Sequence, residues 1–65
     1  MIVEFMSDHN HYGKWYCIAT KNLTVVPQEG TTVRIKEEGC THTITYKVKE
    51  VEFDVDFPKY IVYLS

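Results

Sequence analysis

Histidine, cysteine and aspartate side chains occur in two short stretches of the chain, and side chains of these types can bind zinc. They are Asp8, His9, His11, Cys17, Cys40 and His42. Structural zinc needs tetrahedral nitrogen or sulfur donors, commonly supplied by closely spaced cysteine pairs. The chain contains His-x-His and Cys-x-His spacings but no Cys-x-x-Cys pair. We therefore interpret the segment with His9 and His11 as a polar loop and expect no bound metal or other cofactor, with a structural metal as the alternative.

Cys40 and His42 are also residue types that can act as a nucleophile and its general base. Residues i and i+2 of one strand lie about 6.8 Å apart, which is too far for the hydrogen bond that activates a thiol. Acid and base catalysis by paired carboxylates is equally disfavoured, because a chain of 65 residues has little room for a substrate pocket of about 300–1,000 Å³. We therefore expect no enzymatic activity and no catalytic residues.

Four carboxylates alternate with apolar residues in the second half of the chain. They are Glu50, Glu52, Asp54 and Asp56, which we call the acidic face. Alternate residues of a strand share a side, so the acidic face would lie opposite a half-buried side with Val51, Phe53 and Val55. Such charge is typical of the solvated side of a strand, where it discourages edge-to-edge pairing. It is also the best candidate for partner binding, as a docking stripe for a basic protein or as a mimic of nucleic acid.

Four basic residues form a counterpart, which we call the basic cluster: Arg34, Lys36, Lys47 and Lys49. They would point outward from a hairpin beside the acidic face. Exposed charges of this kind commonly balance one another, and each pair contributes about 0–1 kcal/mol. Binding of RNA or single-stranded DNA through a basic groove with stacking aromatics, here Tyr12, Trp15 or Tyr16, is the functional alternative. The net charge of −2 weakens this alternative without removing it.

The elements that must position these groups are short strands separated by turns. Aromatic and β-branched residues with period-two alternation predict strands, and clusters of Ser, Asn, Gly and Pro predict turns. The predicted strands are residues 2–6, 14–20, 23–26, 31–36, 41–57 and 60–64, of which 23–26 would be a short edge strand. In the second strand we expect Trp15, Cys17 and Ala19 on one side and Tyr16 and Ile18 on the other.

The longest predicted strand changes its alternation halfway. Its apolar residues occupy even positions and then odd ones: Ile44, Tyr46 and Val48, followed by Val51, Phe53, Val55 and Phe57. A shift of one residue moves every side chain to the other side of a strand, so we expect a bulge, bend or break near Lys49 and Glu50. Five or six short strands, one of them bent, predict an all-β fold: a small antiparallel barrel, closed or half-closed.

Five segments of the chain show a resemblance to a known class of proteins. They are Val26-Pro27-Gln28-Glu29-Gly30, Val33-Arg34-Ile35, Tyr46-Lys47-Val48-Lys49-Glu50-Val51, Phe53-Asp54-Val55-Asp56 and Ile61-Val62-Tyr63-Leu64. Through them, residues 25–64 resemble short uncharacterised proteins of phages and bacterial mobile elements that form a small SH3-like β-barrel. The segments 8–12 and 38–42 depart from that pattern. The resemblance implies an SH3-like fold and a phage origin, and it brings no activity and no site residues.

Size and composition set the class of the protein. The chain has 45% hydrophobic and 25% charged residues, which indicates one globular domain over residues 1–65 and excludes a disordered chain. The longest apolar run, residues 60–64, is far shorter than the ~20 residues that span a bilayer, and the first residues lack a signal-peptide pattern. We therefore expect a soluble, cytoplasmic protein. Cys17 and Cys40 would be reduced and partly buried, with a disulfide as the alternative.

These features together predict a non-catalytic protein-interaction module, encoded by a phage or mobile element, that binds a basic host partner through the acidic face. Two alternatives stay open at this point. One is a small nucleic-acid-binding barrel that uses the basic cluster. The other is an oligomeric structural component of a larger assembly, in which exposed edges such as residues 60–64 pair between chains.

Overall fold

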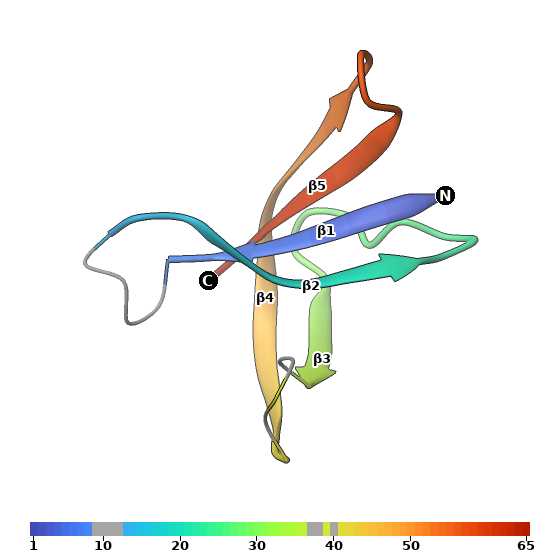
Figure 1. Ribbon diagram of the computed structural model, residues 1–65. Helices are drawn as coiled ribbons and strands as arrows, with labels where there is room; N and C mark the ends of the chain where they lie inside the picture. Colours follow the sequence, from blue (N-terminus) through green and yellow to red (C-terminus); the bar gives the residue numbers. More distant parts are fainter. Residues whose placement is uncertain (9–12, 37–38, 40) are drawn as a thin grey trace.

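The computed structural model describes residues 1–8, 13–36, 39 and 41–65, and these residues form strands, turns and loops (Figure 1). The five strands are β1 (Ile2–Ser7), β2 (Tyr16–Asn22), β3 (Thr32–Lys36), β4 (Thr43–Asp54) and β5 (Lys59–Leu64). They confirm the predicted all-β fold class. The described residues include no helix that is long and apolar enough to cross a membrane.

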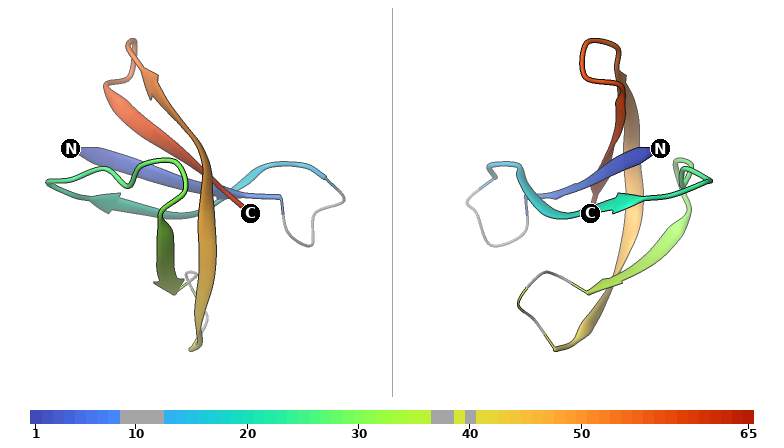
Figure 2. Two further views of the ribbon diagram at one scale, coloured as in Figure 1. Left: turned by 180° about the vertical axis from the view of Figure 1, so that it is seen from behind. Right: turned by 45° about the vertical axis from the view of Figure 1, so that its right-hand side comes forward.

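The strands form one sheet in the order β2-β1-β5-β4-β3, and the sheet curls into a half-barrel (Figure 2). β1 and β5 run parallel, with Val3 opposite Tyr60, whereas the other neighbouring pairs are antiparallel. The prediction of a wholly antiparallel barrel is therefore wrong at this pair. A parallel pair needs a long crossover connection, and here β2, β3 and β4 together provide it. The SH3-like arrangement within this barrel-like fold stays a prediction.

β4 is the longest strand and contains the predicted irregularity. Its register with β5 shifts between Val48 and Glu50, which leaves Lys49 as the extra residue of a β-bulge. Val48 is 2% exposed and Val51 is half-buried, so both face the core although an odd number of positions separates them. The bulge thus confirms the bend expected near Lys49 and Glu50.

The same region of β4 is where the strand changes its partner, from β3 before the bulge to β5 after it. The turn that precedes β3 is tied to this point. The Thr31 N–H donates to the Gln28 carbonyl, the Gly30 N–H donates to the Val48 carbonyl, and the Val48 N–H donates to the Thr31 carbonyl. Gly30 has a φ of 88°, a left-handed conformation that suits glycine at the third position of a turn. The β3–β4 and β4–β5 hairpins therefore branch from one fixed region.

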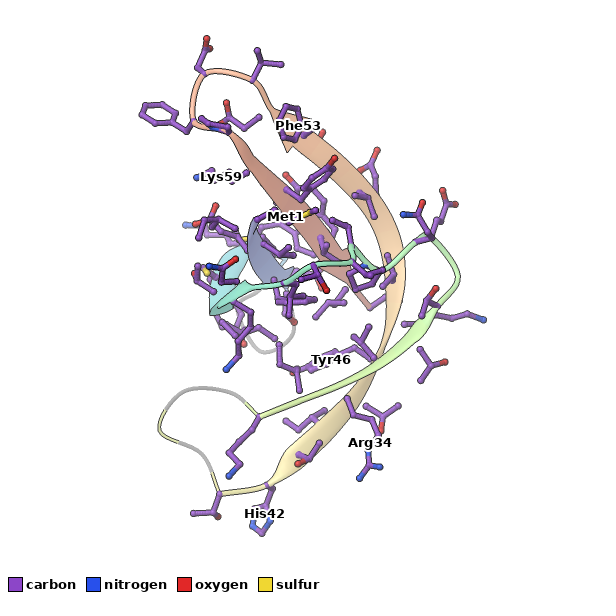
Figure 3. All side chains as sticks on the ribbon, turned by 90° about the vertical axis from the view of Figure 1, so that its right-hand side faces the viewer. Met1, Arg34, His42, Tyr46, Phe53 and Lys59 are labelled. Atoms are coloured by element: carbon purple, nitrogen blue, oxygen red, sulfur yellow. The ribbon has the colours of Figure 1, made fainter. Side chains whose placement is uncertain are left out.

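The core lies on the inner side of the curl and receives side chains from all five strands. Its buried hydrophobic residues are Val3, Phe5, Ile18, Ala19, Ile35, Tyr46, Val48, Val62 and Leu64. In Figure 3, Tyr46 points into the curl while Arg34, on the neighbouring strand, points away from it. The alternation in the longest predicted strand put Ile44, Tyr46 and Val48 on one side; Tyr46 and Val48 are buried there, whereas Ile44 is exposed.

Two predicted details of the first half are wrong. Residues 23–26 form no strand, because after β2 the chain bends away from the sheet on its way to β3. In β2, Ile18 and Ala19 are both buried. The reason is a second bulge: Phe5 lies opposite Ala19, and the next residue of β1 lies opposite Cys17. Ala19 therefore faces the core, on the side opposite Cys17.

We expect Leu64→Ala to unfold much of the protein at room temperature. Leu64 is 0% exposed, and truncating a buried leucine costs about 2–5 kcal/mol through lost burial and the cavity left behind. A single small core supplies only about 3–5 kcal/mol of stability. Val25→Ala is the matched control, because Val25 is 75% exposed and its truncation should change the unfolding free energy by less than ~0.5 kcal/mol. Urea unfolding followed by circular dichroism measures both, and similar losses would contradict the described core.

Candidate interaction surface at the tip of the β4–β5 hairpin

The β4–β5 hairpin stands out from the half-barrel, and residues 55–58 form the turn at its end (Figure 1). We call residues 53–57 the hairpin tip. Asp54 holds it in place: its Oδ1 accepts the backbone N–H of Asp56 at 3.1 Å and that of Phe57 at 3.2 Å. Aspartate side chains stabilise turns by binding the backbone that follows them. The hairpin tip is therefore a preformed loop.

Three apolar side chains of the hairpin tip are largely exposed. The exposed fraction is 51% for Phe53, 78% for Val55 and 70% for Phe57. Phe53 packs against Tyr60, with ring centroids 4.8 Å apart. The prediction that Phe53 and Val55 are half-buried is wrong, because β3 pairs only with the other half of β4 and no described strand lies across this end of the sheet. Exposed apolar side chains that gather in one place are typical of an interaction site.

The structure places the four residues of the acidic face in two settings. Glu50, Glu52 and Asp54 occupy alternate positions on the outward side of β4, whereas Asp56 lies in the turn beyond the strand. Two of these carboxylates have structural roles. Glu52 Oε1 accepts a hydrogen bond from the Tyr63 hydroxyl at 2.7 Å, and Asp54 holds the turn. The acidic face is thus a stripe along β4 that Asp56 continues onto the hairpin tip.

An open hollow of about 620 Å³ brings the apolar and acidic groups onto one surface. Its lining residues are Glu52, Phe53, Asp54, Val55, Asp56 and Ile61. A group that fits this surface needs apolar atoms for the exposed side chains and positive charge for the carboxylates. The sequence signal for this surface was the alternation of carboxylates with apolar residues up to Pro58. It located the residues but did not show that the apolar ones are exposed.

Directly after the turn, Lys59 joins β5 to β1. Its Nζ lies 2.7 Å from Glu4 Oε1 and 6.0 Å from the centroid of the Phe57 ring. The hydrogen bond to Glu4 raises the pKa of Lys59 above its ordinary value of 10.5. This ammonium connects the parallel pair of strands to the aromatic ring of the hairpin tip.

Three residues of the basic cluster lie together on the outward side of the β3–β4 hairpin: Arg34, Lys36 and Lys47. Lys49 is separated from them by its position in the bulge, and its Nζ lies 5.6 Å from the centroid of the Trp15 ring. Trp15 also packs edge-on against Tyr63, with centroids 4.9 Å apart. Figure 3 places Arg34 and Phe53 toward opposite ends of β4. Arg34 and the hairpin tip therefore lie far apart along β4.

The candidate thiol Cys17 differs from its prediction in its exposure. Cys17 is a free thiol and is exposed rather than partly buried, because the bulge in β2 turns it outward. Its Sγ lies 3.5 Å from the Ala19 carbonyl oxygen and 3.5 Å from the Thr20 hydroxyl. Within the part of the chain that the structure describes, no group of three or more His, Cys, Asp or Glu side chains could hold a metal ion. The other candidates lie outside that part: His9, His11, Tyr12 and Cys40.

We expect Asp54→Ala to loosen the hairpin tip, with a loss of about 1 kcal/mol in unfolding free energy, because two backbone donors lose their acceptor. Asp54→Asn keeps an acceptor oxygen and should retain most of this stability. Asp56→Ala is the matched control. Urea unfolding gives the free energies, and the amide NMR signals of residues 56 and 57 report on the turn. Equal effects of the Ala substitutions at positions 54 and 56 would contradict the role of Asp54.

We also expect the contribution of Tyr63 to stability to disappear at alkaline pH. The hydrogen bond to Glu52, partial burial, and the negative charges of Glu52 and Glu50 raise the pKa of Tyr63 from 10.0 to about 12. A raised pKa means that the folded protein holds the phenol proton more tightly, so the stabilisation is complete below pH 10.0 and is lost as the pH rises toward 12.

The test compares urea unfolding of the native protein and Tyr63→Phe from about pH 8 to about pH 12. Near neutral pH the native protein should be more stable by about 1 kcal/mol, the size expected for a surface hydrogen bond to a carboxylate. Titration of all other groups cancels in the difference. A difference that does not change across this range would show that Tyr63 does not donate to Glu52.

No family model matches the chain, and no match was found among the curated proteins or the solved structures. The similarity of residues 25–64 to SH3-like phage proteins therefore stays a prediction.

Proposed function

We propose that this chain is a non-catalytic protein-interaction module whose binding element is the hairpin tip. One observation carries the proposal: apolar side chains that are more than half exposed, Phe53, Val55 and Phe57, stand on a turn that Asp54 holds in shape. Apolar surface at a protruding and ordered position gains free energy when a partner covers it. The proposal includes that the chain is encoded by a phage or mobile element and that its partner is a protein of the host.

The partner should be basic and should also offer apolar side chains. Glu52, Asp54 and Asp56 line the same hollow as the exposed apolar residues, so a partner that covers the hollow brings its own charges close to these carboxylates. Lysine or arginine there gains attraction, whereas acidic residues are repelled. The apolar contacts supply affinity, and the carboxylates select the partner.

The nucleic-acid alternative has weaker support. Arg34, Lys36 and Lys47 do share the outward side of the β3–β4 hairpin. Single-strand binding in small barrels also uses aromatic rings on which bases stack. The candidate ring Trp15 already contacts the Lys49 ammonium and the edge of the Tyr63 ring. Tyr16 is half-buried. The favoured function is therefore protein binding at the hairpin tip.

Selection of random displayed peptides on the immobilised protein tests this function. We expect enrichment of peptides with Lys or Arg next to aliphatic or aromatic residues, because these match the carboxylates and the exposed apolar side chains. Binding of a selected peptide should fall at least about tenfold, or ~1.4 kcal/mol, in Val55→Ser/Asp56→Lys/Phe57→Ser. These three residues are exposed, so the fold should survive. Calorimetry measures the affinity, and a thermal melt checks the fold.

The control is Lys14→Glu/Lys47→Glu, which changes exposed charge away from the hairpin tip and should leave peptide binding intact. Failure to enrich any peptide class, or equal binding by the variant with the altered tip, would overturn the proposal. A gel shift with short single-stranded DNA and RNA at low salt, where phosphate contacts are strongest, completes the test. A shift that Arg34→Glu abolishes would establish nucleic-acid binding in place of the proposed function.

A further inference from the structure

A second surface of the half-barrel has the properties that the hairpin tip requires of a partner. Between the edge strands β2 and β3 lies a cavity of about 400 Å³, which we call the edge groove. Its lining residues are Phe5, Lys21, Leu23, Val33, Arg34 and Ile35. Phe5 and Ile35 are buried, and Leu23 and Val33 are half-buried, so most of the lining is apolar. Its size lies at the low end of the ~300–1,000 Å³ of ligand pockets, which suits a few side chains.

The charged residues that line the edge groove are both positive. Lys21 is exposed and pairs in register with Val3, which places it on the core side of the sheet at the groove. Arg34 is exposed on β3, on the other edge. Over the described ranges the one ion pair joins Glu4 and Lys59, so neither of these two cations is in an ion pair there. The edge groove is thus an apolar opening with Lys21 on its inner side, while Arg34, whose side chain points outward from β3, lies at its rim.

We propose that the edge groove binds the hairpin tip of a second copy of this chain. The inference rests on the proposed function, because it uses the same tip, and it names the partner. Val55 and Phe57, which are 78% and 70% exposed, enter the apolar groove. The carboxylates beside them, Asp56 foremost, meet Lys21 and Arg34. Both the apolar and the charged parts of the two surfaces are complementary.

The contact has to form between chains. The edge groove is lined by residues of β1, β2, β3 and the segment after β2, and no residue of the hairpin tip is among them. Figure 3 shows Phe53 and Arg34 far apart along the molecule. Because the two surfaces differ, the contact is heterologous: each contact uses the tip of one chain and the groove of another, so a pair of chains still has one free tip and one free groove for further copies. Such contacts build filaments, or rings where the rotation closes.

The association should be weak and sensitive to salt. A stable interface buries about 800 Å² on each partner, which is a large part of the 4758 Å² surface of this chain. The hairpin tip and a groove of about 400 Å³ form a smaller contact. The charged pairs at its border are screened over about 8 Å at physiological ionic strength. The assembly should therefore grow with protein concentration and shrink as salt is added.

Sedimentation velocity of the purified protein tests the inference, at concentrations from about 10 μM to about 1 mM, where weak contacts dissociate. We expect the weight-average mass to at least double across this range at low salt. The tip variant Val55→Ser/Phe57→Ser and the groove variant Lys21→Glu/Arg34→Glu should each stay monomeric. An equimolar mixture of the two should form a 1:1 complex that grows no further, because only one intact tip and one intact groove remain.

The matched control is Lys14→Glu/Lys49→Glu, which changes the net charge as much as the groove variant does, at exposed positions outside the groove and the hairpin tip, and should associate like the native protein. Thermal melts check that every variant is folded. A native protein that stays monomeric over the whole range overturns the inference. A mixture of the two variants that stays monomeric also overturns it. Association that survives in the groove variant would show a tip-to-tip contact and would remove the edge groove from the model of assembly.

The groove variant also separates this inference from the proposed function, because its hairpin tip is intact. It should bind the selected basic peptides as tightly as the native protein does. If the native protein is monomeric while the peptides still bind at the hairpin tip, the second copy is the wrong partner and the proposed function stands. If the tip variant binds those peptides as tightly as the native protein does, the proposed function fails as well.

Discussion

The extra residue at Lys49 is the constraint on which the rest of the structure depends. β4 must bury Val48 where it leaves β3 and Val51 where it pairs with β5, and a regular strand would turn one of the two outward. Exposure of a fully buried apolar side chain forfeits about 1.5–3 kcal/mol, so either outcome would weaken the core. The bulge removes this conflict and bends the strand. The extra residue Lys49 thus lets both valines face the core, and it makes the β3–β4 and β4–β5 hairpins point in different directions.

The bulge also divides the outward side of β4 by charge. Lys47 precedes the bulge and Lys49 occupies it, whereas Glu50 and Glu52 follow it. The net charge of −2 therefore hides two surfaces of opposite sign toward opposite ends of β4. Exposed charges more than about 8 Å apart are largely screened from one another at physiological ionic strength. A partner at the far end of either half of β4 therefore meets mainly one sign of charge, and the bulk charge says little about what binds.

Much of this fold is predictable from local pattern, and the failures share one cause. Strand positions and the bulge near Lys49 follow from the alternation of apolar residues, which is a property of neighbouring positions. The parallel pairing of β1 with β5 depends on how the ends of the chain meet, and no local pattern encodes that. The exposure of Phe53 and Val55 depends on the absence of a described strand across the hairpin. For the candidate site, the alternation located the carboxylates but could not show that Glu52 and Asp54 already bind Tyr63 and the turn.

The hairpin tip combines order with exposure, and folding alone does not account for both. A domain of this length buries only about 60% of the surface of its unfolded chain. Each apolar side chain that stays exposed to water therefore adds nothing to the stability of an already small core. Val55 and Phe57 are nevertheless exposed. At the same time Asp54 binds two backbone amides of the turn, and Lys59 lies near the Phe57 ring. A loop that is already ordered loses less entropy when a partner covers it. Order without burial distinguishes a binding loop from a frayed end, and it is why the hairpin tip, rather than the acidic stripe alone, is the surface to which we assign the interaction.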